Sequence, residues 1–194
     1  MTLLGTLLKN RRAGEARLVW NQPQLQSAGL LGLTSHQFQD GGPLPLDHVA
    51  KPFGGRNLSP ELAWSPPPEG TAQLLLVVED FDVPLPRPAV HCLALITPSD
   101  LASPHRLPTG GLSAQEPAPG VTILRSTIGR GYQGPGPIKG HGPHHYAFQL
   151  FALATGANGT GPAAAPERAK PRTFLASVTG PVLARGRLTG TFER

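Results

Sequence analysis

Glycine and proline interrupt this chain so often that few segments between them are long enough for a helix. The 24 glycines and 23 prolines make up 47 of the 194 residues. Between their clusters stand short apolar runs, such as Leu74–Val78, Cys92–Ile96 and Phe148–Ala154. Short apolar runs bounded by turn residues are typical of strands. The pattern therefore predicts a mostly β protein, an antiparallel sandwich of two sheets with one or two small helices.

The expected elements divide the chain into an extension, residues 1–33, and one domain, residues 34–194. In the extension Leu3, Leu4, Leu7 and Leu8 have helical spacing, which predicts a short amphipathic helix that packs on the domain, on a dimer partner or on a membrane surface. A second helix is expected from Pro171 to Val178, because proline suits the first helical turn. Strands are expected at Leu62–Trp64, Leu74–Glu79, Val90–Ile96, Val121–Ser126, His145–Ala154 and Val182–Phe192.

Charge and composition limit the classes of function. The 17 Lys and Arg against 12 Asp and Glu give a net charge of +5, which favours an anionic partner such as phosphate or an anionic lipid. Basic residues interleaved with aromatic ones are missing, so no nucleic-acid platform is expected. No apolar stretch reaches the ~20 residues that span a bilayer, and the first basic residues follow the leucines, the reverse of a secretory signal. A cytoplasmic protein without a transmembrane segment is expected.

Several common catalytic motifs are absent or lack the structural context that they need. The stretch Gly129–Gly134 spells G-x-G-x-x-G, but Pro135 follows it where a dinucleotide site needs a helix to begin. Neither a P-loop nor a G-x-S-x-G elbow is present. Cys92, the one cysteine, directly follows His91 in an expected strand, where neighbours point to opposite faces. It is therefore expected in the core, and disulfides and Cys-based metal sites are excluded.

Polar side chains gather where expected strands end beside glycine-rich loops. They are Asp80 and Asp82 after one strand, His91 near the start of the next, and His144 with Tyr146 at the start of a third. Strand periodicity puts His144 and Tyr146 on one face and His145 on the other. A carboxylate beside an imidazole fixes its tautomer and favours its charged form. With donors from Tyr146 and from the N–H groups of the Gly134–Gly142 loop, these residues predict a small anion pocket.

Two other interpretations of the same residues stay open. A histidine in a strand is often an ordinary core or surface residue. Alternatively, His141, His144 and His145 with His91 and a carboxylate have the chemistry of metal ligands. His145 is expected to face away from the others, which counts against the metal site.

Ordered motifs then connect the chain with a known family. They include Asp40–Pro45, Asn57–Trp64 and Pro68–Thr71, then Asp80–Pro84 where the family has D-P-D-A-P, and Gly134–Tyr146 where it has G-P-x-P-P-x-G followed by H-R-Y. From about Ser35 to Arg194 the chain resembles the phosphatidylethanolamine-binding protein family, in particular its bacterial Raf-kinase-inhibitor-like branch. The resemblance implies a Greek-key β-sandwich with an anion pocket.

The resemblance also implies roles for particular residues. Carried over by position, the ligand-binding residues are Asp80, His91, His144 and Tyr146. Asp82 is implied to be structural, turning its loop through local backbone hydrogen bonds. The other residues implied to support the pocket loops are Pro84, Gly134, Gly136, Pro137 and Gly140.

Five positions depart from the family pattern. Phe81 replaces a proline and Val83 an alanine, so the loop gains bulk beside the pocket. Cys92 stands where an aromatic residue is usual, which is expected to thin one wall. Ile138 replaces a proline at the rim, and His145 replaces an arginine, which is expected to weaken a clamp on the loop.

The leading functional hypothesis is a non-enzymatic protein, without a cofactor or metal, that binds a small anionic ligand or phospholipid head group. His91 and His144 would hold a phosphate, phosphoethanolamine or carboxylate group, Tyr146 would donate to it, and Asp80 would orient an imidazole. By analogy with the family, the protein would modulate a kinase or protease. One alternative is a His- or metal-dependent hydrolase with an Asp80–His91 base and Ser59 as nucleophile. Another is an interaction module that forms a homodimer through residues 1–33.

Overall fold

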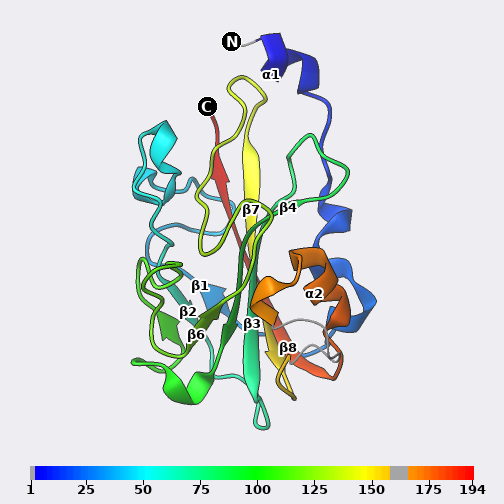
Figure 1. Cartoon of the computed structure of the whole chain (residues 1–194), viewed down its shortest axis with the longest axis vertical. Coiled ribbons are helices and arrows are strands. Elements are labelled where there is room, and N and C mark those ends of the chain that lie inside the picture. The colour runs from blue at the N-terminus through cyan, green and yellow to red at the C-terminus, as the bar shows by residue number, and fades with distance from the viewer. Residues whose placement is uncertain (1–2, 158–165) are drawn as a thin grey trace.

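The computed structural model describes residues 3–157 and 166–194, which contain two antiparallel sheets (Figure 1). In the smaller sheet the order is β1-β2-β5, formed by Leu33–Thr34, Leu62–Trp64 and Arg106–Leu107. In the larger sheet the order is β6-β4-β3-β7-β8, formed by Val121–Ile123, Ala89–Ile96, Gln73–Asp80, His144–Leu153 and Val182–Phe192. The prediction of a mostly β fold with two antiparallel sheets and few helices is confirmed.

The helical elements are short and lie outside the sheets. The α-helices are α1, Leu3–Leu8, and α2, Pro171–Ser177, both where the sequence predicts them. Single 3-10 turns occupy Glu15–Arg17, Val19–Asn21, Pro23–Leu25, Leu46–His48, Lys51–Phe53, Pro98–Asp100 and Pro166–Arg168. Among the described residues no helix is long and apolar enough to cross a bilayer.

Most strand predictions match within a residue or two, and the exceptions have local causes. The strand β6 ends at Ile123 and not at Ser126, because the Ser126 hydroxyl accepts the N–H groups of Ile128 and Gly129 and turns the chain. The two-residue strands β1 and β5 were not predicted, since two residues are too few to show a period.

The larger sheet is the middle of three layers. One face packs on the smaller sheet through residues such as Trp64, Leu76 and Phe148. The other face is covered by α2 and by the 3-10 turns of the N-terminal segment, where Val19 and Leu25 are fully buried (Figure 1). Both faces of β3, β4 and β7 are therefore dry, which is why their apolar runs are nearly continuous.

Two buried polar side chains fasten the N-terminal segment to the sheet. The Val19 N–H donates to Oε2 of Glu79 at 2.8 Å, and the Trp20 N–H donates to Oε1 of Gln149 at 2.9 Å. The segment around Val19 thus packs in the same core as the residues after 33. By contrast, Leu3 and Leu7 of α1 are 93% and 80% exposed, so what covers this helix stays a prediction.

Candidate functional site

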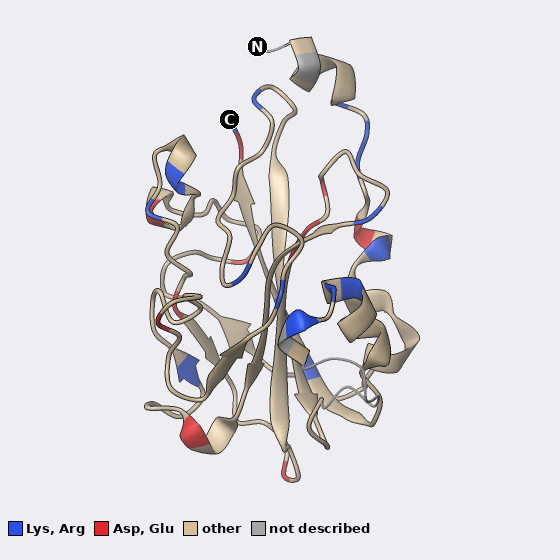
Figure 2. Ribbon diagram, in the orientation of Figure 1, with Lys and Arg blue, Asp and Glu red and all other residues tan. Residues whose placement is uncertain are grey.

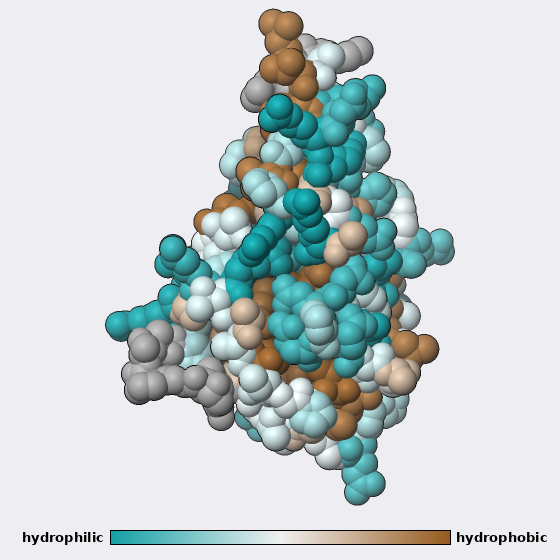
Figure 3. Space-filling model, turned by 90° about the vertical axis from the view of Figure 1, so that its right-hand side faces the viewer, coloured by the Kyte–Doolittle hydropathy of each residue, from teal (hydrophilic) through white to brown (hydrophobic). Residues whose placement is uncertain are grey.

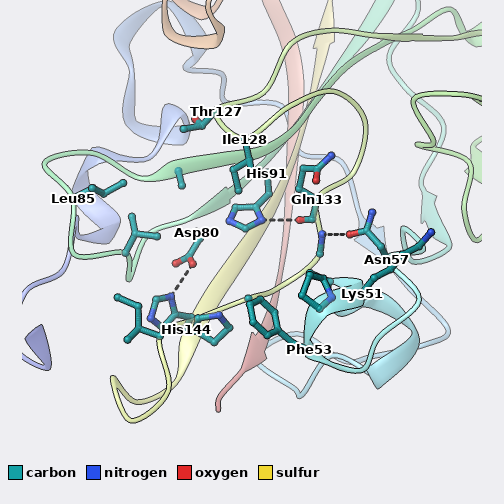
Figure 4. Close-up of a pocket in the computed structure, with 18 of the residues that line it drawn as sticks. Lys51, Phe53, Asn57, Asp80, Leu85, His91, Thr127, Ile128, Gln133 and His144 are labelled. Atoms are coloured by element: carbon teal, nitrogen blue, oxygen red, sulfur yellow. Dashed lines mark hydrogen bonds and ion pairs between the residues drawn. The ribbon is translucent and has the colours of Figure 1, made fainter. Parts of the chain in front are cut away.

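A pocket of about 700 Å³ opens where β3 ends and where β4 and β7 begin (Figure 4). Each of these strands supplies one titratable side chain to the lining: Asp80, His91 and His144. Most of the remaining wall is apolar and includes Phe53, Val83, Pro84, Leu85, Ile128, Pro137 and Ile138. The pocket therefore combines a few convergent polar groups with a broad apolar surface, the usual composition of a small-molecule site.

A β-bulge aims His91 into this pocket. Val78 of β3 pairs with Cys92, but the next residue, Glu79, pairs with Val90, so His91 has no partner in the register. A bulge inserts one extra residue and re-aims its side chain. The insertion places His91 on the same side of the sheet as Asp80 and His144. Regular alternation along β4 would have directed it to the opposite face.

Asp80 and His144 form a buried pair. They are 2% and 1% exposed, and Oδ2 of Asp80 lies 2.7 Å from Nδ1 of His144. The other oxygen, Oδ1, accepts the N–H of Asp82 at 2.9 Å. Asp80 thus orients an imidazole, as the sequence predicts, and the imidazole is that of His144 and not of His91. The local turn hydrogen bond predicted for Asp82 is made by Asp80.

His141 extends this pair into a hydrogen-bonded line that ends on the N-terminal segment. Nδ1 of His141 lies 2.7 Å from Nε2 of His144, and Nε2 of His141 lies 2.9 Å from the carbonyl of Leu8. A carbonyl only accepts, so Nε2 of His141 carries a proton. The two imidazoles thus link the Asp80 carboxylate to the backbone of the N-terminal segment.

This line changes the role of His144. Its Nδ1 faces Asp80 and its Nε2 faces His141, so neither ring nitrogen is left for a ligand. In this arrangement His144 lines the pocket but has no free ring nitrogen for the direct hydrogen bond to an anion that the sequence predicts. His141, which sequence reasoning left unconstrained in its loop, is fully buried and carries out this positioning.

His91 is the pocket imidazole with a nitrogen available to a ligand. Its Nδ1 donates to the carbonyl of Gln133 at 2.6 Å, which fixes the tautomer and leaves Nε2 without a partner in the described residues (Figure 4). Burial lowers the pKa of His91, and the charge of Asp80 opposes this only in part. This buried environment favours neutral His91 with an acceptor at Nε2, which becomes a donor when an anion stabilises the imidazolium.

Tyr146 supports the site from beneath and does not line it. Its ring stands edge-on to that of His91, with centroids 5.2 Å apart and an interplanar angle of 84°. The phenol oxygen is buried beside Asp80 and the N–H of Gly136, and burial raises the pKa of the phenol well above its usual value. The prediction that Tyr146 donates to a bound anion is not supported, because its hydroxyl is not part of the pocket lining.

The glycines of the pocket loop are required by close packing. A Cβ on Gly134 would lie 2.3 Å from the carbonyl oxygen of His48, and one on Gly136 would lie 2.4 Å from the ring of Phe53. Both glycines line the pocket, as do Pro84 and Pro137. Gly140 lies outside the lining, at a turn with φ of 81° whose N–H donates to the carbonyl of Arg194.

The clamp on the loop after β3 is retained, contrary to expectation, because His145, Phe81 and Arg12 together hold the loop. Nδ1 of His145 and the His145 N–H each lie 2.7 Å from Oδ2 of Asp82, and Arg12 of the N-terminal segment lies 2.5 Å from Oδ1. The ring of Phe81 stacks on that of His145 at 5.3 Å. Burial alone would raise the pKa of Asp82, but the hydrogen bonds from His145 and Arg12 outweigh it and lower the pKa.

Cys92 does not line the pocket, so the expected thinning of one pocket wall at this position is not seen. It is fully buried in the core between the sheets, and burial raises the pKa of its thiol to about 12. The thiol is therefore protonated and inert, as expected of a core cysteine.

Four polar lining residues were missed from the sequence, and one of them, Thr127, accepts the N–H of Val90 through its hydroxyl. Lys51 lies on an exposed 3-10 turn at the rim, and Gln133 holds His91 through its carbonyl. Asn57 adopts a φ of 59°; its amide donates to the carbonyl of Tyr132 and accepts the N–H of Gly134 at 2.7 Å. The signal for Asn57 was present, since Gly54-Gly55-Arg56-Asn57 predicts a turn and asparagine tolerates the left-handed region.

The alternative sites are not assembled in this geometry. His145 faces Asp82 and His141 faces backbone carbonyls, and within residues 3–157 and 166–194 no three His, Cys, Asp or Glu are arranged to hold a metal. The Asp80–His91 base of the hydrolase hypothesis is absent, because Asp80 is hydrogen-bonded to His144. Ser59 is buried, and its hydroxyl accepts the N–H of Leu112.

Comparisons with known proteins agree on one family. The family model described as phosphatidylethanolamine-binding protein matches residues 34–193. A UPF0098 protein of Mycobacterium tuberculosis is 32% identical over 181 residues, covering 92% of this chain and 78% of that protein. A UPF0098 protein of Aquifex aeolicus is 30% identical over 178 residues, covering 88% and 94%.

Solved structures show the same fold. Escherichia coli YbcL, described as a new member of the mammalian PEBP family, superposes with a TM-score of 0.68 at 28% identity, covering 84% of this chain and 98% of YbcL. A PEBP homologue from Chlamydia trachomatis has a TM-score of 0.68 at 25% identity, covering 86% and 99%.

Proposed function

The chain belongs to the phosphatidylethanolamine-binding protein family, and we propose that it binds small amphipathic molecules through an anionic head group without transforming them. The observation that carries the proposal is the single unpartnered imidazole nitrogen, Nε2 of His91, aimed into an otherwise largely apolar pocket. The head group would meet this nitrogen, and an aliphatic or aromatic portion would lie against the apolar wall.

The expected recognition of the head group depends on a proton. His91 is buried and favours its neutral form, so an anion at Nε2 binds together with a proton that turns the nitrogen into a charged donor. Hydrogen bonds between two charged groups are roughly twice as strong as neutral ones. Lys51 at the rim adds a second, flexible cation. The Asp80–His144–His141 line, hydrogen-bonded along its length, orders the floor of the pocket.

The apolar wall sets the expected preference among anions. Burial of a methylene group contributes about 0.8 kcal/mol. A head group with a short aliphatic chain should therefore bind more tightly than the bare head group. Phospholipid head groups and carboxylates both belong to this class of anionic ligands. Modulation of a kinase or protease remains a prediction from the resemblance, and a cytoplasmic location remains a prediction from the sequence.

The test is calorimetric titration with hexanoate and acetate at pH 6.5. Hexanoate should bind at least tenfold more tightly than acetate, because its added methylenes are buried against the wall. His91→Gln should weaken hexanoate binding at least tenfold, since the charged donor is lost. Tyr146→Phe is the matched control, because it removes a buried hydroxyl that does not line the pocket; its affinity should stay within twofold of wild type.

Two results would contradict the proposal. Equal affinity for acetate and hexanoate would show that the apolar wall takes no part. Unchanged hexanoate affinity in His91→Gln, or a loss in Tyr146→Phe as large as in His91→Gln, would place the head group elsewhere.

A further inference from the structure

A second hollow, of about 530 Å³, lies on the side of the molecule that carries α2. Its lining includes three arginines from three separate segments: Arg17 from the first 3-10 turn, Arg87 from the loop between β3 and β4, and Arg172 from α2. Gln22 and Pro86 complete the lining. Lysine and arginine gather on this side in Figure 2, and the same side in Figure 3 shows a broad hydrophilic band.

The loop segment that carries Arg87 also holds the guanidinium groups of Arg17 and Arg172 in place. Nη1 of Arg17 donates to the carbonyl of Pro86, and Nη2 of Arg172 donates to the carbonyl of Pro88 at 2.5 Å. Arg87 stands between these two prolines. Proline fixes its own φ, so the Pro86-Arg87-Pro88 segment is a stiff support. Two of the three arginines are thus ordered before any ligand arrives, which reduces the entropy lost on binding.

The charges at this hollow do not cancel. Glu79 is the one carboxylate paired with these arginines in the described part of the chain, with Oε1 lying 2.5 Å from Nη2 of Arg172. Glu79 is fully buried and is not part of the lining. Three guanidinium charges against one carboxylate leave a net charge of +2. Like charges held together repel, so a doubly charged anion would be attracted to this position.

We propose that this hollow binds the phosphate dianion, either free or as a small phosphate monoester. Guanidinium groups present a planar fork of donors that matches phosphate oxygens, and bidentate arginine contacts are the usual means of recognising that group. Each arginine has five N–H donors and uses few of them on the carbonyls and Glu79. The +2 charge matches the dianion and exceeds what a carboxylate or a sulfate ester carries.

The phosphate site is separate from the pocket of His91, although one loop forms part of both. Val83, Pro84 and Leu85 line the first pocket, whereas Pro86 and Arg87 line the second. The two sites differ in chemistry, since the first is largely apolar with one neutral imidazole and the second is rich in fixed positive charge. The phosphate site therefore does not depend on the function proposed for the first pocket.

The experiment uses the full chain in a His91→Gln background at pH 8, where the first pocket lacks its imidazole and methyl phosphate is a dianion. Arginine Nε–H signals are followed by NMR during titration with methyl phosphate, and with methyl sulfate as a singly charged analogue of the same shape. Methyl phosphate should bind saturably and at least tenfold more tightly than methyl sulfate. A parallel titration with inorganic phosphate distinguishes free phosphate from an ester, and saturable binding of either supports the site.

Arg87→Gln is the informative variant, because Arg87 is exposed and makes no hydrogen bond or ion pair that the fold requires among the described residues. It should weaken methyl phosphate binding at least tenfold. Arg11→Gln is the control: Arg11 is another exposed arginine that lines neither hollow, and its loss removes the same charge. Its affinity should stay within twofold. Equal weakening in both variants would show diffuse attraction and overturn the proposal, as would binding that does not saturate.

Discussion

Arg172→Met should lower the free energy of unfolding by about 3–5 kcal/mol, because it leaves a buried carboxylate without its cation. Glu79 is fully buried and its Oε1 lies 2.5 Å from Arg172; its Oε2 accepts the N–H of Val19 and the amide of Gln149. Burial raises the pKa of Glu79, and the charge of Arg172 is the largest effect that opposes it. Removing the charge of Arg172 leaves the cost of burying the Glu79 carboxylate without its largest compensation. Urea denaturation at pH 8 measures the loss.

The pH dependence and two further variants identify the cause. A carboxyl group whose pKa is raised on folding contributes stability below its unfolded pKa of about 4.3, and this is lost as pH rises through the folded pKa. The deficit of Arg172→Met should therefore be smaller at pH 5 than at pH 8. Adding Glu79→Gln should restore most of the loss. Arg187→Met removes the exposed partner of Glu15 and should cost under about 1 kcal/mol. A deficit independent of pH would contradict this explanation.

His144→Ala should also cost about 3–5 kcal/mol, which makes it a poor probe of ligand binding. The substitution leaves Asp80, 2% exposed, with the N–H of Asp82 as its remaining hydrogen-bond partner. It also removes the partner of Nδ1 of His141, so the link to the carbonyl of Leu8 loses its other end. Denaturant unfolding measures the effect, and Asp80→Asn in the same chain should recover part of it by removing the unpaired charge.

The neighbouring histidine supplies the control. His145 is half-exposed, and Asp82 keeps Arg12 and the His145 N–H when the imidazole is removed. His145→Ala should therefore cost about 1 kcal/mol or less. If His145→Ala were as destabilising as His144→Ala, the buried line through Asp80 would not be the source of the difference.

The sequence predicted the strands and the site's location because both depend on local signals. Apolar runs between glycine and proline mark β3, β4, β7 and β8 to within a residue, and the residues beside their ends include Asp80, His91 and His144. These three do meet in one pocket. Periodicity also assigned His144 and His145 correctly to opposite faces, one toward Asp80 and the other toward Asp82.

The chemical roles could not be predicted because they depend on contacts between distant segments. The bulge at His91 is a property of pairing between β3 and β4, and alternation along one strand does not show it. The second partner of His144 is His141, held in turn by carbonyls at the other end of the chain. Arg12 bonds Asp82, which lies 70 residues further along the sequence. This contact maintains the loop clamp that the change to His145 was expected to weaken. Each of these contacts gives a residue a partner that its own segment does not show, and the partner determines the residue's role.

The protonation state of His91 during binding is the most direct test of the central claim. NMR of the labelled imidazole, recorded while hexanoate is added at pH 7, follows Nδ1 and Nε2 separately. The free protein should show a neutral ring protonated on Nδ1. Saturation should produce an imidazolium, and because the anion binds with a proton, affinity should rise as pH falls from 8 to 6. A ring that stays neutral at saturation, or an affinity that rises with pH, would contradict the proposed recognition of an anionic head group.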